Sequence, residues 1–178
     1  QIFESNTIAI DSVTSPAAVC MIEQYMYAYS NKGSFHIGTL NNNLTFIPVG
    51  EFPSGGGATL FYPVLARKRL LHFSHGRLRS YNITNRADPV LVADDPITGE
   101  YSRLEQVGDL LFAVGPGSIG VFQMGLETAT QLSYVPRDAN LIAADNTRFL
   151  TSDGSSILIW DYLTTGVDPE PEPVIRPE

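Results

Sequence analysis

Short runs of apolar residues recur along the chain in pairs, and a turn that contains glycine separates the two members of each pair. The turn glycines are Gly33, Gly76, Gly117 and Gly154, which lie 37 to 43 residues apart. Each pair is typical of a β-hairpin, because strand-forming residues flank a turn whose Gly, Asn, Asp or Ser residues tolerate positive φ. A period of about 40 residues predicts a repeat protein in which each repeat is one four-stranded propeller blade.

The strand after the turn glycine also ends in a repeated order of side chains, aromatic then polar then apolar. Three repeats have this order, in Tyr81–Ile83, Phe122–Met124 and Trp160–Tyr162. In the first repeat Gly38 stands where the aromatic residue is expected. The agreement beyond the glycines strengthens the prediction of an all-β propeller with four repeats.

The pattern predicts a lone first strand, three sets of four strands and a last set of three. The lone strand, Thr7–Val13, is expected to become the outer strand of the last blade, which would close a ring and remove a free sheet edge. The alternative is that the four repeats are a sector of a larger ring, completed by further sequence or by a second chain. The strands of the four sets are predicted at Ala18–Glu23, Tyr25–Ser30, Phe35–Leu40 and Thr45–Gly50; Ala58–Val64, Leu70–Ser74, Leu78–Ile83 and Pro89–Ala93; Ser102–Val107, Leu110–Val114, Ile119–Met124 and Gln131–Val135; Leu141–Ala144, Phe149–Ser152 and Ile157–Tyr162.

These strands divide the chain into one propeller domain and one tail. The domain is expected to cover residues 1–166, with repeats at about 17–56, 57–99, 100–139 and 140–166, the last joined by 7–13. Residues 167–178 alternate Pro and Glu, which cannot pair in a sheet, so this segment is expected to be a linker or a tail.

Composition narrows the choice of partners. A formal net charge of −8 argues against nucleic acid as a ligand, since Lys and Arg must neutralise its phosphates. No apolar run approaches the ~18 residues of a membrane span, so membrane insertion is not expected. The single Cys20 lies in an apolar stretch and is expected to be a buried, inert thiol. The remaining partners are a protein, a glycan or a further copy of the chain.

Two segments resemble known repeat families. The segment Arg69–Val92, with its strand, Gly turn, second strand and Asp-Pro turn, resembles the bacterial Leu-Val-Ile-Val-Asp repeat family. The segment Thr151–Asp161, which ends in Trp-Asp, resembles a Trp-Asp propeller repeat. Both resemblances imply a propeller of the kind common in surface and secreted bacterial proteins. They imply a location that is extracellular, periplasmic or at the cell surface, and no catalytic residues.

Metal sites are predicted only weakly. The three histidines, His36, His72 and His75, are not expected to converge on one ion, because strand alternation sends neighbouring side chains to opposite faces. Asp94, Asp95 and Glu100 are the best oxygen ligands for calcium, although they lack the spacing of a calcium-binding loop and also suit an ordinary loop between blades. No other cofactor is expected.

Aromatic and charged residues near the strand starts are candidates for recognition. Tyr62, Tyr101, Arg103 and Glu105 are the predicted binding residues, since aromatic rings serve both protein and glycan binding. The alternative for the tyrosines is packing between blades.

The sequence favours a non-enzymatic propeller module for protein or glycan interaction or for structural assembly. The first alternative is a lyase or hydrolase domain with a site in the propeller channel, which requires Arg103, Glu105 and Asp145 on or next to the innermost strands to converge. The second is a virion or filament subunit that associates with itself. The sequence contains no nucleophile elbow and no phosphate-binding loop.

Overall fold

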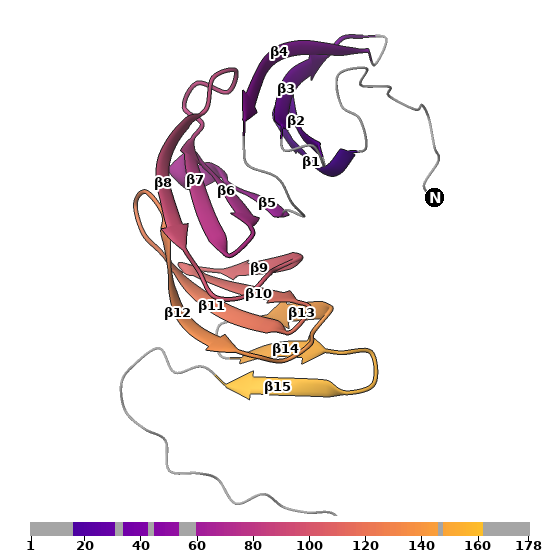
Figure 1. Ribbon diagram of the computed structural model, residues 1–178, viewed down its shortest axis with the longest axis vertical. Coiled ribbons are helices and arrows are strands. Elements are labelled where there is room, and N and C mark those ends of the chain that lie inside the picture. Colours follow the sequence, from indigo (N-terminus) through magenta and orange to yellow (C-terminus); the bar gives the residue numbers. More distant parts are fainter. Residues whose placement is uncertain (1–15, 31–33, 43–44, 54–59, 146–147, 162–178) are drawn as a thin grey trace, which may run out of the picture.

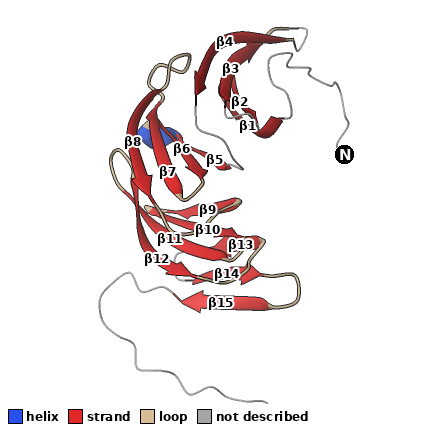
Figure 2. Ribbon diagram, in the orientation of Figure 1, coloured by secondary structure: helices blue, strands red, loops and turns tan. Residues whose placement is uncertain are grey.

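The computed structural model describes residues 16–30, 34–42, 45–53, 60–145 and 148–161, and these are almost entirely β-structure. Their strands form four antiparallel sheets, each built from one contiguous stretch of chain. Three of the sheets have four strands, and the last has three among the residues that are described. The sheets follow one another along an arc as the blades of a β-propeller (Figure 1), with one short 3₁₀ helix beside the second sheet (Figure 2).

We number the blades I to IV in chain order, and every strand pairs with its neighbour in sequence. Blade I consists of β1 (Pro16–Ile22), β2 (Tyr25–Ser30), β3 (Ser34–Leu40) and β4 (Phe46–Pro53). Blade II consists of β5 (Leu60–Val64), β6 (Arg69–Ser74), β7 (Arg77–Asn82) and β8 (Val90–Pro96), with the 3₁₀ helix η1 (Leu65–Arg67) between β5 and β6. Blade III consists of β9 (Arg103–Val107), β10 (Leu110–Gly115), β11 (Ser118–Met124) and β12 (Ala129–Val135). Blade IV consists of β13 (Leu141–Ala144), β14 (Arg148–Ser152) and β15 (Ile157–Asp161).

The turn glycines behave as the sequence predicts. Gly76, Gly117 and Gly154 have φ values of 65°, 62° and 93° in the hairpins of blades II, III and IV. A left-handed backbone at these turns is available to glycine without a Cβ penalty. The predicted fourth turn glycine, Gly33, and the predicted strand Thr7–Val13 lie outside the described residues.

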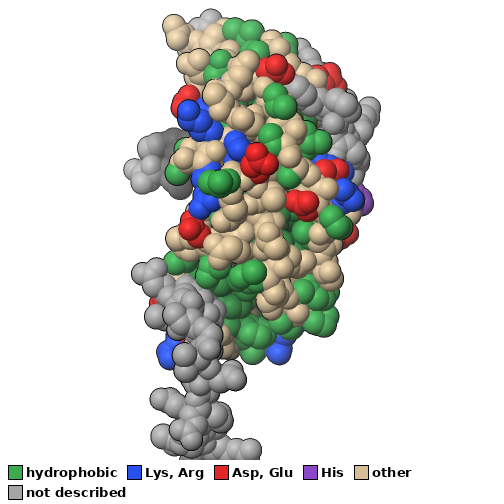
Figure 3. Space-filling view, turned by 90° about the vertical axis from the view of Figure 1, so that its left-hand side faces the viewer, with side chains coloured by type: hydrophobic (Ala, Val, Ile, Leu, Met, Phe, Trp, Pro, Cys, Tyr) green, Lys and Arg blue, Asp and Glu red, His purple; other side chains and the backbone are tan. Residues whose placement is uncertain are grey.

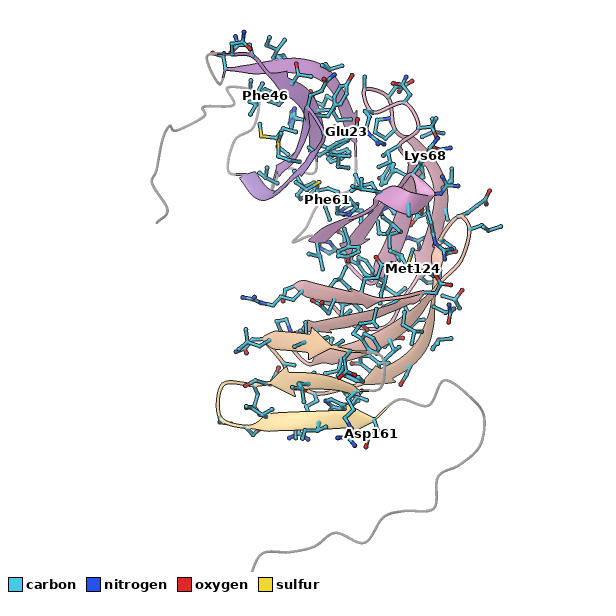
Figure 4. The ribbon with its side chains drawn as sticks, turned by 180° about the vertical axis from the view of Figure 1, so that it is seen from behind. Glu23, Phe46, Phe61, Lys68, Met124 and Asp161 are labelled. Carbon is cyan, nitrogen blue, oxygen red and sulfur yellow. The ribbon has the colours of Figure 1, made fainter. Side chains whose placement is uncertain are left out.

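Aromatic rings fill the interface between blades I and II. Phe35 of blade I stacks on Phe61 of blade II with ring centroids 4.8 Å apart, and Phe61 stacks in turn on His72 at 4.7 Å. Tyr27 and Tyr29 are fully buried in the same cluster. Figure 4 shows Phe61 at the junction of the two blades. Tyr27 and Tyr29 of β2 therefore pack between blades I and II.

The next interface repeats this arrangement with different side chains. Phe73 of blade II meets Phe122 of blade III edge to face, with centroids 5.4 Å apart, and Tyr101 packs against both rings. Between blades III and IV, Phe112 stacks on Phe149 at 4.9 Å and Phe149 stacks on Trp160 at 5.6 Å. The core is thus a row of interfaces, each made by facing sheets, rather than one central cluster.

Polar contacts at the rim join the first three blades. Glu23 in the first hairpin of blade I accepts a hydrogen bond of 2.8 Å from Arg86 of blade II. Arg67 of blade II donates to Asp109 of blade III at 2.5 Å. The exposed Glu23 carboxyl has its pKa lowered, first by this hydrogen bond and then by the charge of Arg86. Such exposed pairs contribute little to stability, so the aromatic interfaces hold the blades together.

The contacts between innermost strands follow chain order. The strand β1 contacts β5, and β13 contacts β9 and β10. Blades I and IV form the two ends of the arc, and no ladder joins their described strands (Figure 1). No helix in the described part of the chain is long and apolar enough to cross a membrane.

Candidate functional site

Tyr101, one of the predicted binding residues, is buried in the interface between blades II and III. Its hydroxyl donates a hydrogen bond of 2.7 Å to the carbonyl oxygen of Thr98 and accepts one of 2.8 Å from the side chain of Gln131. Burial raises the pKa of this phenol, so it stays protonated at physiological pH. The ring contributes to packing, and its hydroxyl is already used within the chain.

The other three predicted binding residues lie on the innermost strands β5 and β9. Tyr62 is half-buried, and its pKa is raised first by burial and then by the negative charge of Glu105 on the next blade. Arg103 is exposed, and it makes no ion pair with Glu105 within the described structure. Tyr62 and Glu105 are therefore brought near each other, while Arg103 is not joined to them.

The residues that a channel enzyme would need are not linked to one another. Asp145 follows β13 and accepts a hydrogen bond of 2.8 Å from the backbone N–H of Arg148. No hydrogen bond or ion pair connects Arg103, Glu105 and Asp145 among the described contacts. Among the described residues, Arg103, Glu105 and Asp145 are therefore not joined into one acid–base site.

The acidic residues Asp94 and Asp95 lie in strand β8 rather than in the expected loop. Asp94 accepts a hydrogen bond of 2.6 Å from Arg77 and lies 3.4 Å from Arg79. Asp95 accepts a hydrogen bond of 2.9 Å from the hydroxyl of Thr128 in blade III. Adjacent strand residues face opposite sides of a sheet, so the two carboxylates diverge.

Glu100, the third residue of the calcium prediction, lies in the loop after β8, where its backbone N–H donates to the hydroxyl of Ser118. Nowhere in the described structure do three His, Cys, Asp or Glu side chains gather as a metal ion requires. Calcium binding by Asp94, Asp95 and Glu100 remains a prediction of the sequence, and a rise of the melting temperature on addition of calcium would support it.

The structure separates the three histidines. His72 is fully buried against Phe61 and Tyr29, and neither of its ring nitrogens has a hydrogen-bond partner in the described structure. Burial, reinforced by the charge of Arg79, lowers the pKa of His72 to about 4. His75 is exposed and lies 3.1 Å from the Ser74 hydroxyl, whereas His36 lies 3.8 Å from Glu51. Cys20 is half-buried, and burial raises the pKa of its thiol to about 12.

The surface that stands out is the far side of blade IV, which we call the terminal face. Strand pairing places Leu150 opposite Ala143 and Ile159, and it places Leu141 and Ile157 on the same side of the sheet. Ile157 is 72% exposed, Ile159 64% and Leu141 53%. Contiguous exposed aliphatic side chains of this kind are uncommon on a free surface, so the terminal face is the candidate interaction surface.

Comparison with the inner blades explains why the terminal face is apolar. The strand of blade III that is equivalent to β15 is β11, and it is buried on both sides over Ser118–Gly120, because blade III lies between two neighbouring blades. β15 has a continuous apolar sequence, Ile157–Trp160, but only the side of Trp160 is covered. The sequence of blade IV therefore has the composition of a sheet with a neighbour on each side.

A groove opens beside β15, where a fourth strand of blade IV would lie. It has a volume of about 660 Å³ and lies between β11 and β12 of blade III and the rings of Phe149 and Trp160. One edge of β15 pairs with β14, and the other edge has no partner strand among the described residues. We call this cavity the edge groove. Figure 3 shows hydrophobic side chains gathered in the lower part of the outer rim, below most of the charged ones.

Sequence reasoning did not identify the terminal face, although its signal is present. A strand that is apolar at consecutive positions predicts burial on both faces, and Ile157–Trp160 is such a strand at the end of the last repeat. The expected closing strand, Thr7–Val13, was assigned to the edge of the last blade, and the face of that blade was not considered.

Comparisons with known proteins agree with the fold. No family model and no curated protein sequence matches the chain. Sqt1 of Saccharomyces cerevisiae matches 87% of this chain at 15% identity with a TM-score of 0.69, and the match covers 48% of Sqt1. The β-propeller domain of Cps50 (Swd1) from Myceliophteria thermophila matches 83% at 10% identity with a TM-score of 0.59, over 54% of that chain.

The computationally designed Ika4 protein matches 89% of this chain at 7% identity with a TM-score of 0.63, and here the match covers 99% of the other chain. At these identities the likeness concerns the fold alone. The chain spans about half the length of Sqt1 and of the Cps50 domain. By its fold the chain is a β-propeller repeat protein.

Proposed function

We propose that this chain is a non-enzymatic propeller module for protein interaction and structural assembly, and that its partner docks on the terminal face of blade IV. The observation that carries the proposal is the exposure of Leu141, Ile157 and Ile159 on a sheet that is apolar on both sides. Covering these side chains would remove apolar area from water, which is the main favourable term in protein association.

The chemistry of the terminal face favours a protein over a glycan. Its exposed side chains are aliphatic, and the rings of blade IV, Phe149 and Trp160, lie on the opposite side of the sheet. Sugar binding relies on stacking against aromatic rings with polar groups beside them. Arg148 and Asp161 form an ion pair of 2.7 Å at one corner of the face, which supplies a polar rim to an apolar patch.

The finer predictions from the sequence accompany this proposal. Membership in the bacterial Leu-Val-Ile-Val-Asp repeat family and a location outside the cytoplasm are both proposed on the basis of the segment Arg69–Val92. Measuring the amount of the tagged full chain in each cell fraction would test the location.

Site-specific photocrosslinking tests the interaction surface. A photoreactive p-benzoylphenylalanine is placed at Ile159, and as a matched control at Leu126, which is 84% exposed in the hairpin between β11 and β12. Illumination of cells that express the full chain is expected to give a discrete covalent adduct from position 159 only. An absence of adducts from position 159, or an equal yield from position 126, would refute the proposed function.

A further inference from the structure

We infer that the partner on the terminal face is a second copy of this chain, joined head to tail so that two arcs complete one ring. The terminal face of each copy covers blade I of the other, and the N-terminal strand Thr7–Val13 of each copy fills the edge groove of the other. This inference rests on the proposed function, since it names the occupant of the same surface.

Each blade has two different faces, and the described row of blades ends in one of each kind. Within the chain, the face of blade I that contains Tyr27, Phe35 and Ile37 packs on blade II. On the opposite face of blade I, Val19 and Met21 of β1 are 53% and 48% exposed, whereas Met26, Ala28 and His36 of β2 and β3 are buried, so the free apolar surface there is that of β1. The terminal face is the corresponding free surface at the other end of the row. In the two-copy ring, blade IV of one copy packs on blade I of the other in the way that consecutive blades pack within the chain. The new contact therefore continues the series of interfaces between blades.

The share of a full propeller that the four blades represent favours two copies. The four blades match about half of Sqt1 and of the Cps50 domain, so the complement of the arc in such a ring has about the same length as the arc itself. A copy of the same chain has this length. The designed Ika4 protein, which the match covers over 99% of its length, is a solved example of a separate chain of this size.

Symmetry makes the assembly finite. A head-to-tail contact forms a closed ring when the rotation between copies closes, and an open filament when it does not. Two copies of a half ring close with two identical interfaces. A stable complex needs roughly 1,200–2,000 Å² of buried surface, and here the requirement is shared by two pairs of facing sheets.

The position of Thr7–Val13 in the sequence agrees with exchange between copies. Only Thr14 and Ser15 separate this segment from Pro16, where β1 begins. A link of this length spans about 10 Å, whereas blade IV of the same chain is three blades away along the arc, or roughly 30 Å at the usual spacing of packed sheets. In the two-copy ring, the blade next to blade I is blade IV of the partner.

The chemistry of the segment fits the edge groove. Ile8 and Ile10 alternate with Thr7, Ala9 and Asp11, so a strand there has one aliphatic side. The groove offers Val121, Leu132 and Trp160 beside the unpaired edge of β15. Strand addition at that edge would give its free backbone groups hydrogen-bond partners and would remove an exposed sheet edge.

The mass of the full chain in solution tests the inference. Light scattering coupled to size-exclusion chromatography is expected to give twice the 19.4 kDa of one chain. A mass of 19.4 kDa at micromolar concentration would overturn the inference, because a single chain would then be complete or would need a different protein. Masses that increase with concentration beyond two copies would also overturn it, because they indicate a filament.

Variants at the two ends separate a head-to-tail ring from other dimers. Ile157→Glu with Ile159→Glu on blade IV, and Met21→Glu on blade I, are each expected to weaken the dimer at least a hundredfold while the circular dichroism spectrum is unchanged. Leu126→Glu is the matched control and should stay dimeric. If the blade IV variant dissociates and Met21→Glu does not, the dimer pairs blade IV with blade IV and the inference is wrong.

Removal of residues 1–13 tests the exchanged strand. The shortened chain is expected to dimerise at least tenfold more weakly than the full chain, and an unchanged dissociation constant would exclude the strand from the interface. The photocrosslink at Ile159 keeps the two proposals distinguishable. An adduct with a different protein leaves the proposed function standing and refutes the second copy, whereas an adduct of two identical chains supports both.

Discussion

Gly38 replaces the aromatic residue that ends the equivalent strand in the other repeats, and the structure gives the physical reason. A Cβ at Gly38 would overlap the ring of Phe46, which comes from the next strand, and the carbonyl oxygen of Ile47. Phe46 is buried over this glycine, so the first blade obtains its ring from β4 instead of β3. The first repeat therefore packs its aromatic ring from a different strand than the other repeats do. The sequence repeat does not reveal this, because Phe46 does not align with the aromatic residues that end the third strands of the other blades.

The variant Gly38→Ala is expected to lower the free energy of unfolding by about 1–3 kcal/mol, since overpacking forces the Phe46 ring and the backbone to move. Urea denaturation measures the change. The double variant with Phe46→Leu should lose less than the sum of the two single variants, because the smaller side chain leaves room for the new methyl group. Additive losses would show that the two residues do not share one space.

His72 is the buried titratable group with the clearest consequence for stability. Its pKa is about 4 in the folded chain, below the ordinary value of 6.5, because burial disfavours the charged ring. The unfolded chain therefore binds a proton more readily between these two pH values. The free energy of unfolding contributed by His72 is constant above pH 6.5 and falls as the pH decreases toward 4.

Between pH 6.5 and 4, we expect the free energy of unfolding to fall by about 3 kcal/mol more in the native protein than in the variant His72→Phe. The phenyl ring keeps the stack on Phe61 and does not titrate, while His36 and His75 are present in both proteins and cancel in the difference. Urea denaturation across this pH range provides the measurement. Parallel pH profiles for the two proteins would contradict the buried, neutral state of His72.

At the scale of elements, blade IV depends on one internal polar contact. The indole N–H of Trp160 on β15 donates a hydrogen bond of 2.8 Å to the buried hydroxyl of Thr151 on β14. Both side chains lie on the face that packs against blade III, where Phe149 stacks on the indole. This contact holds the last described strand of the sheet in position.

Replacing the hydroxyl by a methyl group in Thr151→Val is expected to cost about 1 kcal/mol, because the indole N–H loses its partner in a half-buried position. Trp160 is the single tryptophan of the chain, so its fluorescence reports the change in blade IV directly during urea unfolding. Thr130→Val, at an exposed position on β12, serves as the control. Equal midpoints for the two variants would show that the hydrogen bond contributes nothing.

Most strands could be predicted from the sequence because their apolar residues and turn glycines act locally. The hairpins β6–β7, β10–β11 and β14–β15 follow the predicted ranges within one or two residues. The strand β8 was predicted to end at Ala93 and continues to Pro96, because Arg77 and Arg79 on β7 offset the charge of Asp94. Acidic residues are depleted in strands, so their presence in β8 depends on partners that a local pattern does not reveal.

The helix η1 was not predicted because three residues provide no periodic signal. Its end requires Lys68 in the left-handed region, with φ of 52°, a conformation that the sequence does not favour. The arginine at its end, Arg67, reaches Asp109 of blade III. This element is thus specified by a contact between blades.

At the scale of the whole molecule, the sequence predicts the repeat and the order of the blades, but not which residues remain available for binding. Tyr101 was a candidate for recognition by its position near a strand start, yet it is buried because Gly120 leaves space for its ring. Ile157 and Ile159 were predicted only as members of the strand Ile157–Tyr162, and they are exposed because no described blade follows blade IV. Burial at the ends of a repeat array depends on what lies beyond it, which local patterns do not include.

Each blade is a contiguous stretch of chain whose strands pair only with their neighbours in sequence. During synthesis at about 5–20 residues per second, a finished blade of roughly 40 residues therefore leaves the ribosome every few seconds. Blade I can form its sheet before β5 exists, and each later blade meets a preformed surface on which to fold. Blade IV is synthesised after the three other described blades, so the surface that we propose for assembly becomes available only after they have been made.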